Sequence, residues 1–407
     1  MNYSRRSFLK SAGLGFVALG LPPAFLVRAA GAQEQDARGK VLVVIFQRGG
    51  MDGLNVVIPF KDPAYYQLRP NIAIGEPASG EEKAIDLDGF YGLHPALAPL
   101  KELYNKGHLA IIHAAGSPDN TRSHFDAQDY MEIGTSGIRN TPDGWLNRCL
   151  RERSKTESPM RGVAMTTRTP RMLAGSTPTL TLSSIEEFRL RHEKLGSSLK
   201  KLYANSSDPL FRQGGASLFE AMATLRKVET KIPGSMAIYP NGRFGHNMKQ
   251  VARLIKSDVG LEIAFVEIEG WDTHVNEGGA TGQLANRLKE LGAALGAFYQ
   301  DLDDRMEDVV LLTMSEFGRT ARENGNRGTD HGHANVMFAL GGKIRGGRVL
   351  GRWPGLAPEV LYEGRDLDLT TDYRTICGEV LQHHLGLRTL SAVFPGFRFP
   401  GPLGLIA

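Results

Sequence analysis

Acidic and imidazole side chains gather in a loop between two short apolar runs, within residues 309–342. The runs, Val309–Met314 and Val336–Leu340, are bounded by polar or small residues, as is typical of buried strands. Burying charged and imidazole groups beside a strand costs free energy unless the groups are paired or serve a function. They therefore indicate metal binding or acid–base chemistry. The loop residues that offer such groups are Glu316, Asp330, His331 and His333.

A second pair of such side chains follows another apolar run, Leu261–Ile268. Asp272 and His274 stand two residues apart, shortly after Gly270. In extended backbone, residues i and i+2 face the same side. The two side chains are therefore expected to point together, as two ligands of one metal would.

Asp52 lies in a glycine-rich turn directly after the β-branched run Lys40–Phe46. That run is typical of a central strand buried on both faces. The turn places Asp52 at the carboxyl end of the strand, where it would be a metal-ligand candidate. An Asp before a Gly is also common in ordinary turns, which is the structural alternative.

Hydroxyl and basic groups follow the predicted strand Leu109–His113. Thr121 or Ser123 would cap the predicted helix Phe125–Met131. The same position suits a nucleophile, because a helix N-terminus carries a positive field and free N–H groups. Arg122 could hold two oxygens of a phosphate or sulfate, and His124 stands beside it. A plain helix cap with solvated neighbours is the alternative.

The elements around these residues follow a strand–helix–strand order along most of the chain. This order predicts a three-layer α/β/α domain over residues 40–390 with a largely parallel central sheet. The candidate residues all follow predicted strands, and ligands bind at the carboxyl ends of strands in open α/β sheets. Residues 151–242 differ in composition, being rich in Ser, Thr, Lys and Arg. We interpret them as an inserted, cap-like segment.

The first 32 residues have the layout of a twin-arginine signal peptide. Arg5 and Arg6 precede a modest apolar run, Ala12–Val27, and a small-residue cleavage site, Ala30–Ala32. We expect export by the twin-arginine machinery to the periplasm or the extracellular space. Pro22 and Pro23 interrupt the run, and no later run is long enough to span a bilayer. No stable membrane span is expected after cleavage.

The charge balance of the remaining chain gives no reason to expect nucleic-acid binding. The chain has 48 Lys and Arg residues and 44 Asp and Glu residues. Four of the basic residues and none of the acidic ones fall within residues 1–32. The excess of basic residues therefore belongs to the predicted leader, and nucleic acid is excluded as an expected partner.

Six short motifs, read together, resemble a bacterial family described only as a domain of unknown function, number 1501. They are RGGMDGLN (48–55), GLHPAL (92–97), TRSHFDAQD (121–129), GWDTH (270–274), SEFGRT (315–320) and GTDHGHA (328–334). That family is often exported by the twin-arginine route. It is similar in sequence organisation to the alkaline-phosphatase and sulfatase superfamily, so the resemblance implies an alkaline-phosphatase-like fold.

The superfamily resemblance also implies residue roles. Asp52 resembles the first metal-ligating Asp, and Thr121 or Ser123 resembles the nucleophile. Asp272 and His274 resemble an Asp…His ligand pair, and His331 or His333 resembles the last His ligand.

Two positions depart from the superfamily pattern. Glu316 and Phe317 stand where active members have Asp-His, and Phe317 cannot replace an imidazole. Asn120 stands where the sulfatase motif has Pro, which argues against formylglycine-type sulfatase chemistry.

The expected function is that of an exported, metal-dependent hydrolase of phosphate or sulfate esters, with a small anionic ester as substrate. The alternatives are a binding or scaffold protein that keeps the fold without turnover, and a phosphoryl transferase or mutase. The expected cofactor is a divalent metal, zinc first, with manganese, magnesium and calcium as alternatives. The predicted metal ligands are Asp52, Asp272, His274, Glu316, Asp330, His331 and His333, and the predicted catalytic residues are Thr121, Arg122, Ser123 and His124.

Overall fold

The apolar run Val41–Arg48 forms the central strand, β1, because its side chains alternate between two buried faces. Val43 and Ile45 belong to one hydrophobic core, and Val44 and Phe46 to another. The computed structural model describes residues 39–78, 82–153, 158–188, 193–231 and 236–407. The predicted leader, residues 1–32, lies outside the described residues. Lys40–Ala407 form one compact unit.

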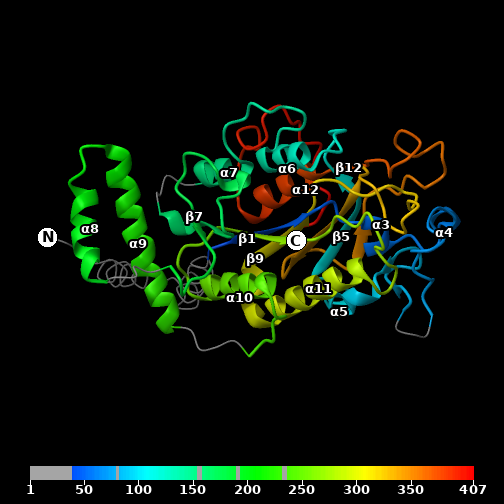
Figure 1. Ribbon diagram of the computed structural model, residues 1–407, viewed down its shortest axis with the longest axis horizontal. Helices are drawn as coiled ribbons and strands as arrows, with labels where there is room; N and C mark the ends of the chain where they lie inside the picture. Colours follow the sequence, from blue (N-terminus) through cyan, green and yellow to red (C-terminus); the bar gives the residue numbers. More distant parts are fainter. Residues whose placement is uncertain (1–38, 79–81, 154–157, 189–192, 232–235) are drawn as a thin grey trace, which may run out of the picture. The chain divides into compact units, whose positions relative to one another are not determined.

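The central sheet within the described residues has nine strands (Figure 1). Their order is β11-β5-β10-β9-β1-β8-β6-β7, and β12 also pairs with β5. All the pairings are parallel except those of β10 with β5 and β9. The prediction of a largely parallel sheet is thus confirmed, and the reversed direction of β10 is an addition to it. The strands other than β1 are β5 (Leu109–Gly116), β6 (Gly162–Met165), β7 (Leu180–Leu182), β8 (Ile263–Glu269), β9 (Val309–Met314), β10 (Asn335–Gly341), β11 (Arg348–Leu350) and β12 (Thr371–Asp372).

Helices cover both faces of the sheet, which confirms the three-layer architecture (Figure 1). One face packs against α5 (Ala98–Asn105), α10 (Arg243–Lys256) and α11 (Gln283–Leu302). The other packs against α6 (His124–Ile133), α7 (Trp145–Arg153) and α12 (Tyr373–Glu379), which continues as a π-helical turn, Val380–His384. Ser123 caps α6 as predicted, because its side chain accepts a hydrogen bond from the Asp126 N–H.

The register of the three central strands brings their carboxyl ends together. Arg48 of β1 pairs with Glu269 of β8, and Phe46 of β1 pairs with Met314 of β9. The segments that follow these strands therefore leave the sheet side by side, and they are the segments that carry the predicted site residues.

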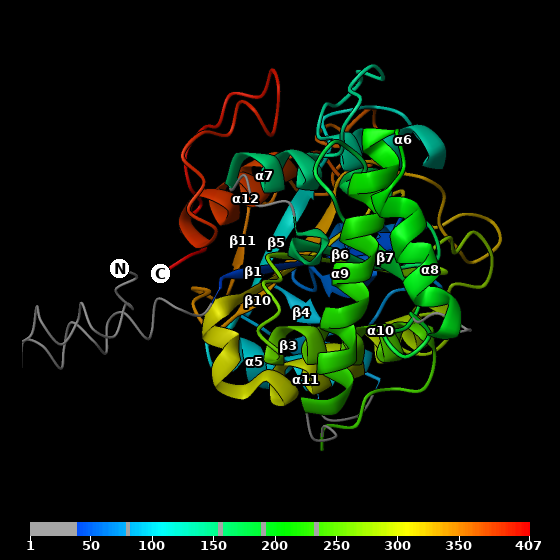
Figure 2. The ribbon, with the colours of Figure 1, turned by 90° about the vertical axis from the view of Figure 1, so that its left-hand side faces the viewer.

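Residues 151–242 contribute to the central sheet as well as to a helical pair. β6 and β7 lie within this segment and extend the sheet beyond β8, a role that the sequence did not predict. The helices α8 (Glu193–Ala204) and α9 (Pro209–Lys231) lie side by side (Figures 1 and 2). Leu225 and Val228 of α9 join the hydrophobic core that contains β6. That this segment caps the site stays a prediction.

A small sheet and two short helices complete the part that follows β1. The sheet is formed by β2 (Val57–Ile58), β4 (Gly92–Leu93) and β3 (Ile85–Asp86). The helices are α3 (Gly53–Val56) and α4 (Pro63–Leu68). Cys149 and Cys377, whose pairing the sequence leaves open, are both buried and free. Among the described residues, none of the helices has the length and apolar character needed to cross a membrane.

Candidate metal centre

Three imidazoles meet around one carboxylate at the carboxyl ends of the central strands. Asp272 and His274 come from the segment after β8, His331 from the loop between β9 and β10, and His124 from the first turn of α6. The Nε2 atoms of His274, His331 and His124 lie 3.0, 3.3 and 3.5 Å from Asp272 Oδ1. The Asp272 side chain is 47% exposed, so this cluster is open to solvent.

The other ring nitrogen of each imidazole contacts a hydrogen-bond acceptor. Nδ1 of His124 lies 2.8 Å from Glu316 Oε1, and Nδ1 of His274 lies 2.9 Å from Asp330 Oδ1. The Nδ1 atom of His331 lies 2.7 Å from the carbonyl oxygen of Arg122. Each of these partners accepts a hydrogen bond from Nδ1–H, and in that neutral tautomer Nε2 presents its lone pair to the cluster.

This arrangement of lone pairs fits a bound cation. The Nε2 atoms of His274 and His331 lie 2.9 Å apart, so the tautomer with both Nδ1 atoms protonated brings two lone pairs together. Nε2 of His124 is buried without a hydrogen-bond partner among the described residues. Single ligand atoms of His124, Asp272 and His331 all lie within 4.8 Å of one another. Metal-binding histidines characteristically donate Nδ1–H to a carboxylate or carbonyl and bind through Nε2.

Glu316 is a partner of His124 and not a member of the cluster. Its carboxylate is almost fully buried and accepts hydrogen bonds from the Gly49 N–H and the Gln128 amide, at 2.8 and 2.9 Å. Burial alone would raise the pKa of Glu316, but the bonds from His124, Gln128 and Gly49 outweigh it, and the pKa is lowered. The same bond to Glu316 raises the pKa of His124 against the effect of burial. In this structure Glu316 therefore orients His124, and its predicted role as a direct ligand stays a prediction.

One face of α6 supplies this supporting network. His124, Gln128 and Glu132 stand four residues apart, so they share a face of the helix. Gln128 accepts a hydrogen bond from Arg48 at 2.9 Å, and Glu132 pairs with Arg48 at 3.0 Å. Arg48, the last residue of β1, thus joins α6 to the strand end, and Gln128 joins it to Glu316.

Arg319 is fully buried beneath the cluster and connects the segments after three strands. It donates to backbone carbonyls of Gly50, Trp271 and Thr329. It also donates to Asp272 Oδ1 at 2.6 Å. Burial raises the pKa of Asp272, but the Arg319 hydrogen bond and charge outweigh it, so the pKa is lowered and Asp272 stays ionised at neutral pH.

Phe317 packs against two of the imidazoles, whose own ring centroids lie 4.3 Å apart. Its ring centroid lies 4.9 Å from that of His124 and 4.8 Å from that of His331. The cluster still has three imidazoles, because His124 contributes one from α6. His124 was among the predicted catalytic residues, and its place beside Asp272 was not foreseen.

Asp52 is separate from the cluster. Both of its carboxylate oxygens accept hydrogen bonds from Arg69, and both side chains are fully buried. Burial raises the pKa of Asp52, but the charge and hydrogen bonds of Arg69 outweigh it. An ion pair thus already uses both oxygens of Asp52, and we do not include it in the proposed ligand set; its predicted ligand role stays a prediction.

The side chains of two further predicted residues contact partners outside the cluster. The guanidinium of Arg122 pairs with Asp366 and Glu363, both at 2.7 Å, and its predicted role in holding an anion stays a prediction. Its backbone carbonyl orients His331. His333 stacks on Tyr362, with ring centroids 4.2 Å apart, and it lies outside the cluster.

Asp330 and the two hydroxyls lie around the cluster. Asp330 orients His274 and also accepts from the Asn324 amide at 3.1 Å. Thr121 Oγ1 accepts a hydrogen bond from the Ser123 N–H at 3.2 Å, and Ser123 is the helix cap. No contact between either hydroxyl and the cluster is found among the described residues. Whether one of them is a nucleophile stays a prediction.

Several solved structures are similar to this chain at low identity. The zinc complex of the C-terminal periplasmic domain of EcEptC from Escherichia coli has 8% identity, covers 75% of this chain and 73% of its own, and has a TM-score of 0.36. PsFucS1 sulfatase from Pseudoalteromonas sp. has 11% identity, with 80% and 66% covered and a TM-score of 0.37. Phosphonate monoester hydrolase of Agrobacterium radiobacter has 11% identity, with 89% and 78% covered and a TM-score of 0.37. At such scores these likenesses do not bear on what the chain does.

The sequence comparisons point to a family. No curated protein matches the chain. The family model described as "Protein of unknown function (DUF1501)" matches residues 108–393, well over half of the chain. The protein therefore belongs to the DUF1501 family, as its motifs predict.

Proposed function

We propose that the protein is a metal-dependent hydrolase of phosphate or sulfate esters. Its metal ligands would be His124, His274, His331 and Asp272. The observation that carries the proposal is the shared orientation of the three imidazoles. Each ring donates Nδ1–H to an oxygen, and each Nε2 faces Asp272 Oδ1 within 3.5 Å.

Three imidazoles and one carboxylate favour zinc, with manganese as the next candidate. A divalent ion bound there would polarise an ester oxygen and stabilise negative charge that develops in the transition state. The exposed side of Asp272 leaves room for a substrate. The ester hydrolase proposal also agrees with the residue roles that the motif resemblance implies, although the ligand set differs from the implied one.

The chain itself provides positive potential for an anionic ester. α6 begins at His124, so the N–H groups of its first turn are directed out of the helix end beside the cluster. Buried Arg319 adds a fixed positive charge behind Asp272. Glu316, Asp330 and the Arg122 carbonyl hold the three rings in place, so little reorganisation is needed when substrate binds.

The export step belongs to the proposal on sequence grounds alone. The predicted twin-arginine leader over residues 1–32 would deliver the folded protein, with its metal, outside the cytoplasm. The small anionic ester would then be met in the periplasm or the extracellular space.

The test combines metal analysis with a substrate panel on the purified chain. We expect one tightly bound divalent metal per chain, and hydrolysis of at least one of 4-nitrophenyl phosphate, bis(4-nitrophenyl) phosphate and 4-nitrophenyl sulfate. The double variant His124→Ala/His331→Ala should lose both metal and activity. His383→Ala removes an exposed imidazole of the π-helical turn and serves as the matched control.

Two outcomes would contradict the proposal in different ways. A chain that neither retains nor takes up a divalent metal would refute the metal centre. Stoichiometric metal without turnover of any ester would instead favour a binding protein that lacks catalysis.

A further inference from the structure

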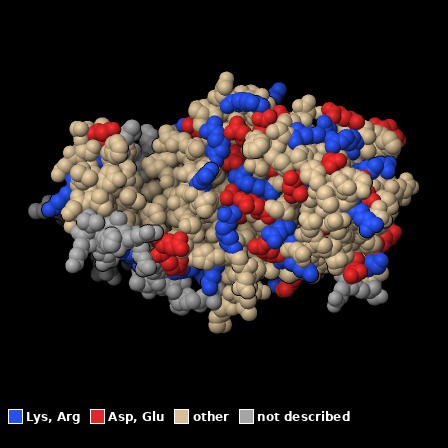
Figure 3. Space-filling model, in the orientation of Figure 1, with Lys and Arg blue, Asp and Glu red and all other residues tan. Residues whose placement is uncertain are grey.

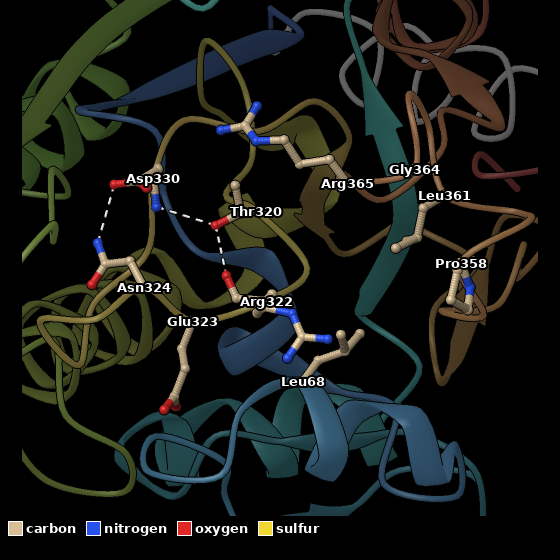
Figure 4. Close-up of a pocket in the computed structure, with 10 residues that line it drawn as sticks. All are labelled: Leu68, Thr320, Arg322, Glu323, Asn324, Asp330, Pro358, Leu361, Gly364 and Arg365. Atoms are coloured by element: carbon tan, nitrogen blue, oxygen red, sulfur yellow. Dashed lines mark hydrogen bonds between the residues drawn. The ribbon is translucent and has the colours of Figure 1, made fainter.

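A cavity of about 280 Å³ (Figure 4) has two lining residues that contact proposed metal ligands. Asp330 lines the cavity and also accepts the Nδ1–H of His274. Arg365 lines the cavity and donates to the carbonyl oxygen of His331 at 2.8 Å. An ester whose reacting group lies at the cluster would therefore extend its organic part toward this cavity.

Part of the cavity wall is apolar. Leu68, Pro358 and Leu361 contribute it, from the end of α4 and from the segment before β12. Figure 4 shows Leu361 directed into the space between these segments. Such a wall favours an aromatic ring or a short aliphatic group over a strongly hydrated sugar.

Two polar side chains of the wall are already used within the protein. The Glu323 carboxylate accepts backbone N–H groups of Asn71 and Ile72, at 3.0 and 3.1 Å. The Asn324 amide donates to the carbonyl of His274 at 2.9 Å. These side chains form part of the wall, but their hydrogen bonds are made within the protein and not to a ligand.

Arg322 differs from its neighbours in the wall. Its side chain is exposed and extends toward Leu68 (Figure 4). In the part of the chain that the structure describes, no carboxylate forms an ion pair with it. A guanidinium that is unpaired, and that stands beside an apolar wall, suits a carboxylate, phosphate or sulfate at the far end of an apolar group.

We propose that this cavity binds the organic part of the substrate and selects an apolar group that ends in a second negative charge, which Arg322 holds. This inference rests on the proposed ester hydrolase function and deepens it, because it names the class of substrate: an ester with two anionic ends. Asp330 lies near the reacting end of such a substrate, and Arg322 binds the other end.

The test uses probes that are not hydrolysed, so that it does not depend on turnover. Binding of phenylphosphonate and of 4-carboxyphenylphosphonate to the zinc-loaded full chain is measured by calorimetry, together with a 4-(carboxymethyl)phenyl analogue to allow for arm length. We expect a carboxylated probe to bind about tenfold more tightly, which is near the low end for a hydrogen bond to a charged group.

Two charge-removing variants identify the residue responsible. Arg322→Met should abolish the preference for the carboxylated probes. Arg327→Met should keep it, because Arg327 is an exposed arginine of the same loop that does not line the cavity. Arg322→Glu should reverse the preference toward 4-(aminomethyl)phenylphosphonate, and this keeps the test informative if the Met variant folds poorly.

Each result distinguishes this proposal from the hydrolase proposal. Equal binding of all the probes by the natural chain, or equal losses in the two Met variants, would overturn the cavity assignment and leave the metal centre untouched. A preference that depends on Arg322, in a chain that turns over no ester, would support the cavity assignment and refute the hydrolase.

Discussion

Replacing Asp52 by Asn and Glu277 by Gln, singly and together, tests how the chain uses the buried charges beneath the metal centre. Asp52 and Arg69 are fully buried and form a two-point ion pair. Glu277 is also fully buried, and its Oε2 accepts hydrogen bonds from Thr273 and Thr329, at 2.9 and 2.6 Å. Burial and the neighbouring Asp52 charge raise the pKa of Glu277 well above its ordinary value. The opposite directions of the two pKa shifts therefore assign the proton of this pair to Glu277, and the negative charge that faces Arg69 to Asp52.

The expected magnitudes follow from this arrangement. Below about pH 4.3, where Glu277 is protonated in both the folded and the unfolded chain, Glu277→Gln should change the free energy of unfolding by less than about 1 kcal/mol, because a neutral amide replaces a neutral acid. Asp52→Asn should cost about 3 kcal/mol, the low end for breaking a buried ion pair. The low end applies because Glu277 can ionise once the Asp52 charge is gone. The double variant leaves Arg69 without a carboxylate, so it should exceed the sum of the single effects by about 1–3 kcal/mol.

The assay is urea unfolding of the metal-free full chain, with constant m-values as the check on two-state behaviour. Metal-free protein is needed because bound metal adds its own stabilisation. Additive single effects, or a Glu277→Gln loss as large as that of Asp52→Asn, would refute the assignment of the proton to Glu277.

The pH dependence provides a second check on the same reasoning. The folded-state pKa of Glu277 lies above its unfolded-state value, so the native state keeps a proton that the unfolded chain releases as pH rises above about 4.3. This group therefore lowers stability progressively with rising pH until its folded pKa is reached. Relative to the natural chain, Glu277→Gln should gain stability across that window. A difference that does not change with pH would contradict the raised pKa.

Three further predictions address the site itself. Glu316→Gln should weaken zinc affinity by about 10- to 100-fold, as expected for the partner of a metal-binding histidine, and competition with a chromogenic chelator would measure it. Asp52→Asn should change zinc affinity by no more than about threefold, because both carboxylate oxygens of Asp52 are bonded to Arg69. A loss of affinity as large as that of Glu316→Gln would restore Asp52 as a ligand. Ser123→Ala should cost about 1 kcal/mol of stability through loss of the α6 cap while zinc affinity is kept, and single-turnover kinetics would show whether its hydroxyl also forms a covalent intermediate.

The distribution of charged residues on the surface does not mark the candidate site. Basic and acidic side chains are interspersed on the face drawn in Figure 3. The groups that matter for the proposed chemistry are half-buried, and they are recognised by what each ring nitrogen contacts, not by where charge accumulates.

Local sequence was sufficient to predict the elements and part of the site. β1, β8 and β9 are continuous apolar runs, so their positions and the parallel sheet could be inferred from pattern alone. Asp272 and His274 could be paired because their spacing acts within one extended segment. Ser123 could be identified as a cap for the same reason, since a cap and its helix are neighbours in sequence.

The tertiary structure decided which of the remaining candidates meet. Glu316 and His124 are 192 positions apart, and Arg122 and His331 are 209 apart. Such contacts depend on strand register and on where α6 begins, which no local pattern specifies. Asp52 looked like a ligand because it follows the central strand, but only the folded chain brings Arg69 against it. The four-residue spacing of His124, Gln128 and Glu132 was a visible sign that α6 presents a polar face to the interior. The sequence therefore determined the central strands, the helix cap and the pairing of Asp272 with His274, because these are set by neighbours. The fold decided the third imidazole and the partners of every ring, because these are set by contacts between distant segments.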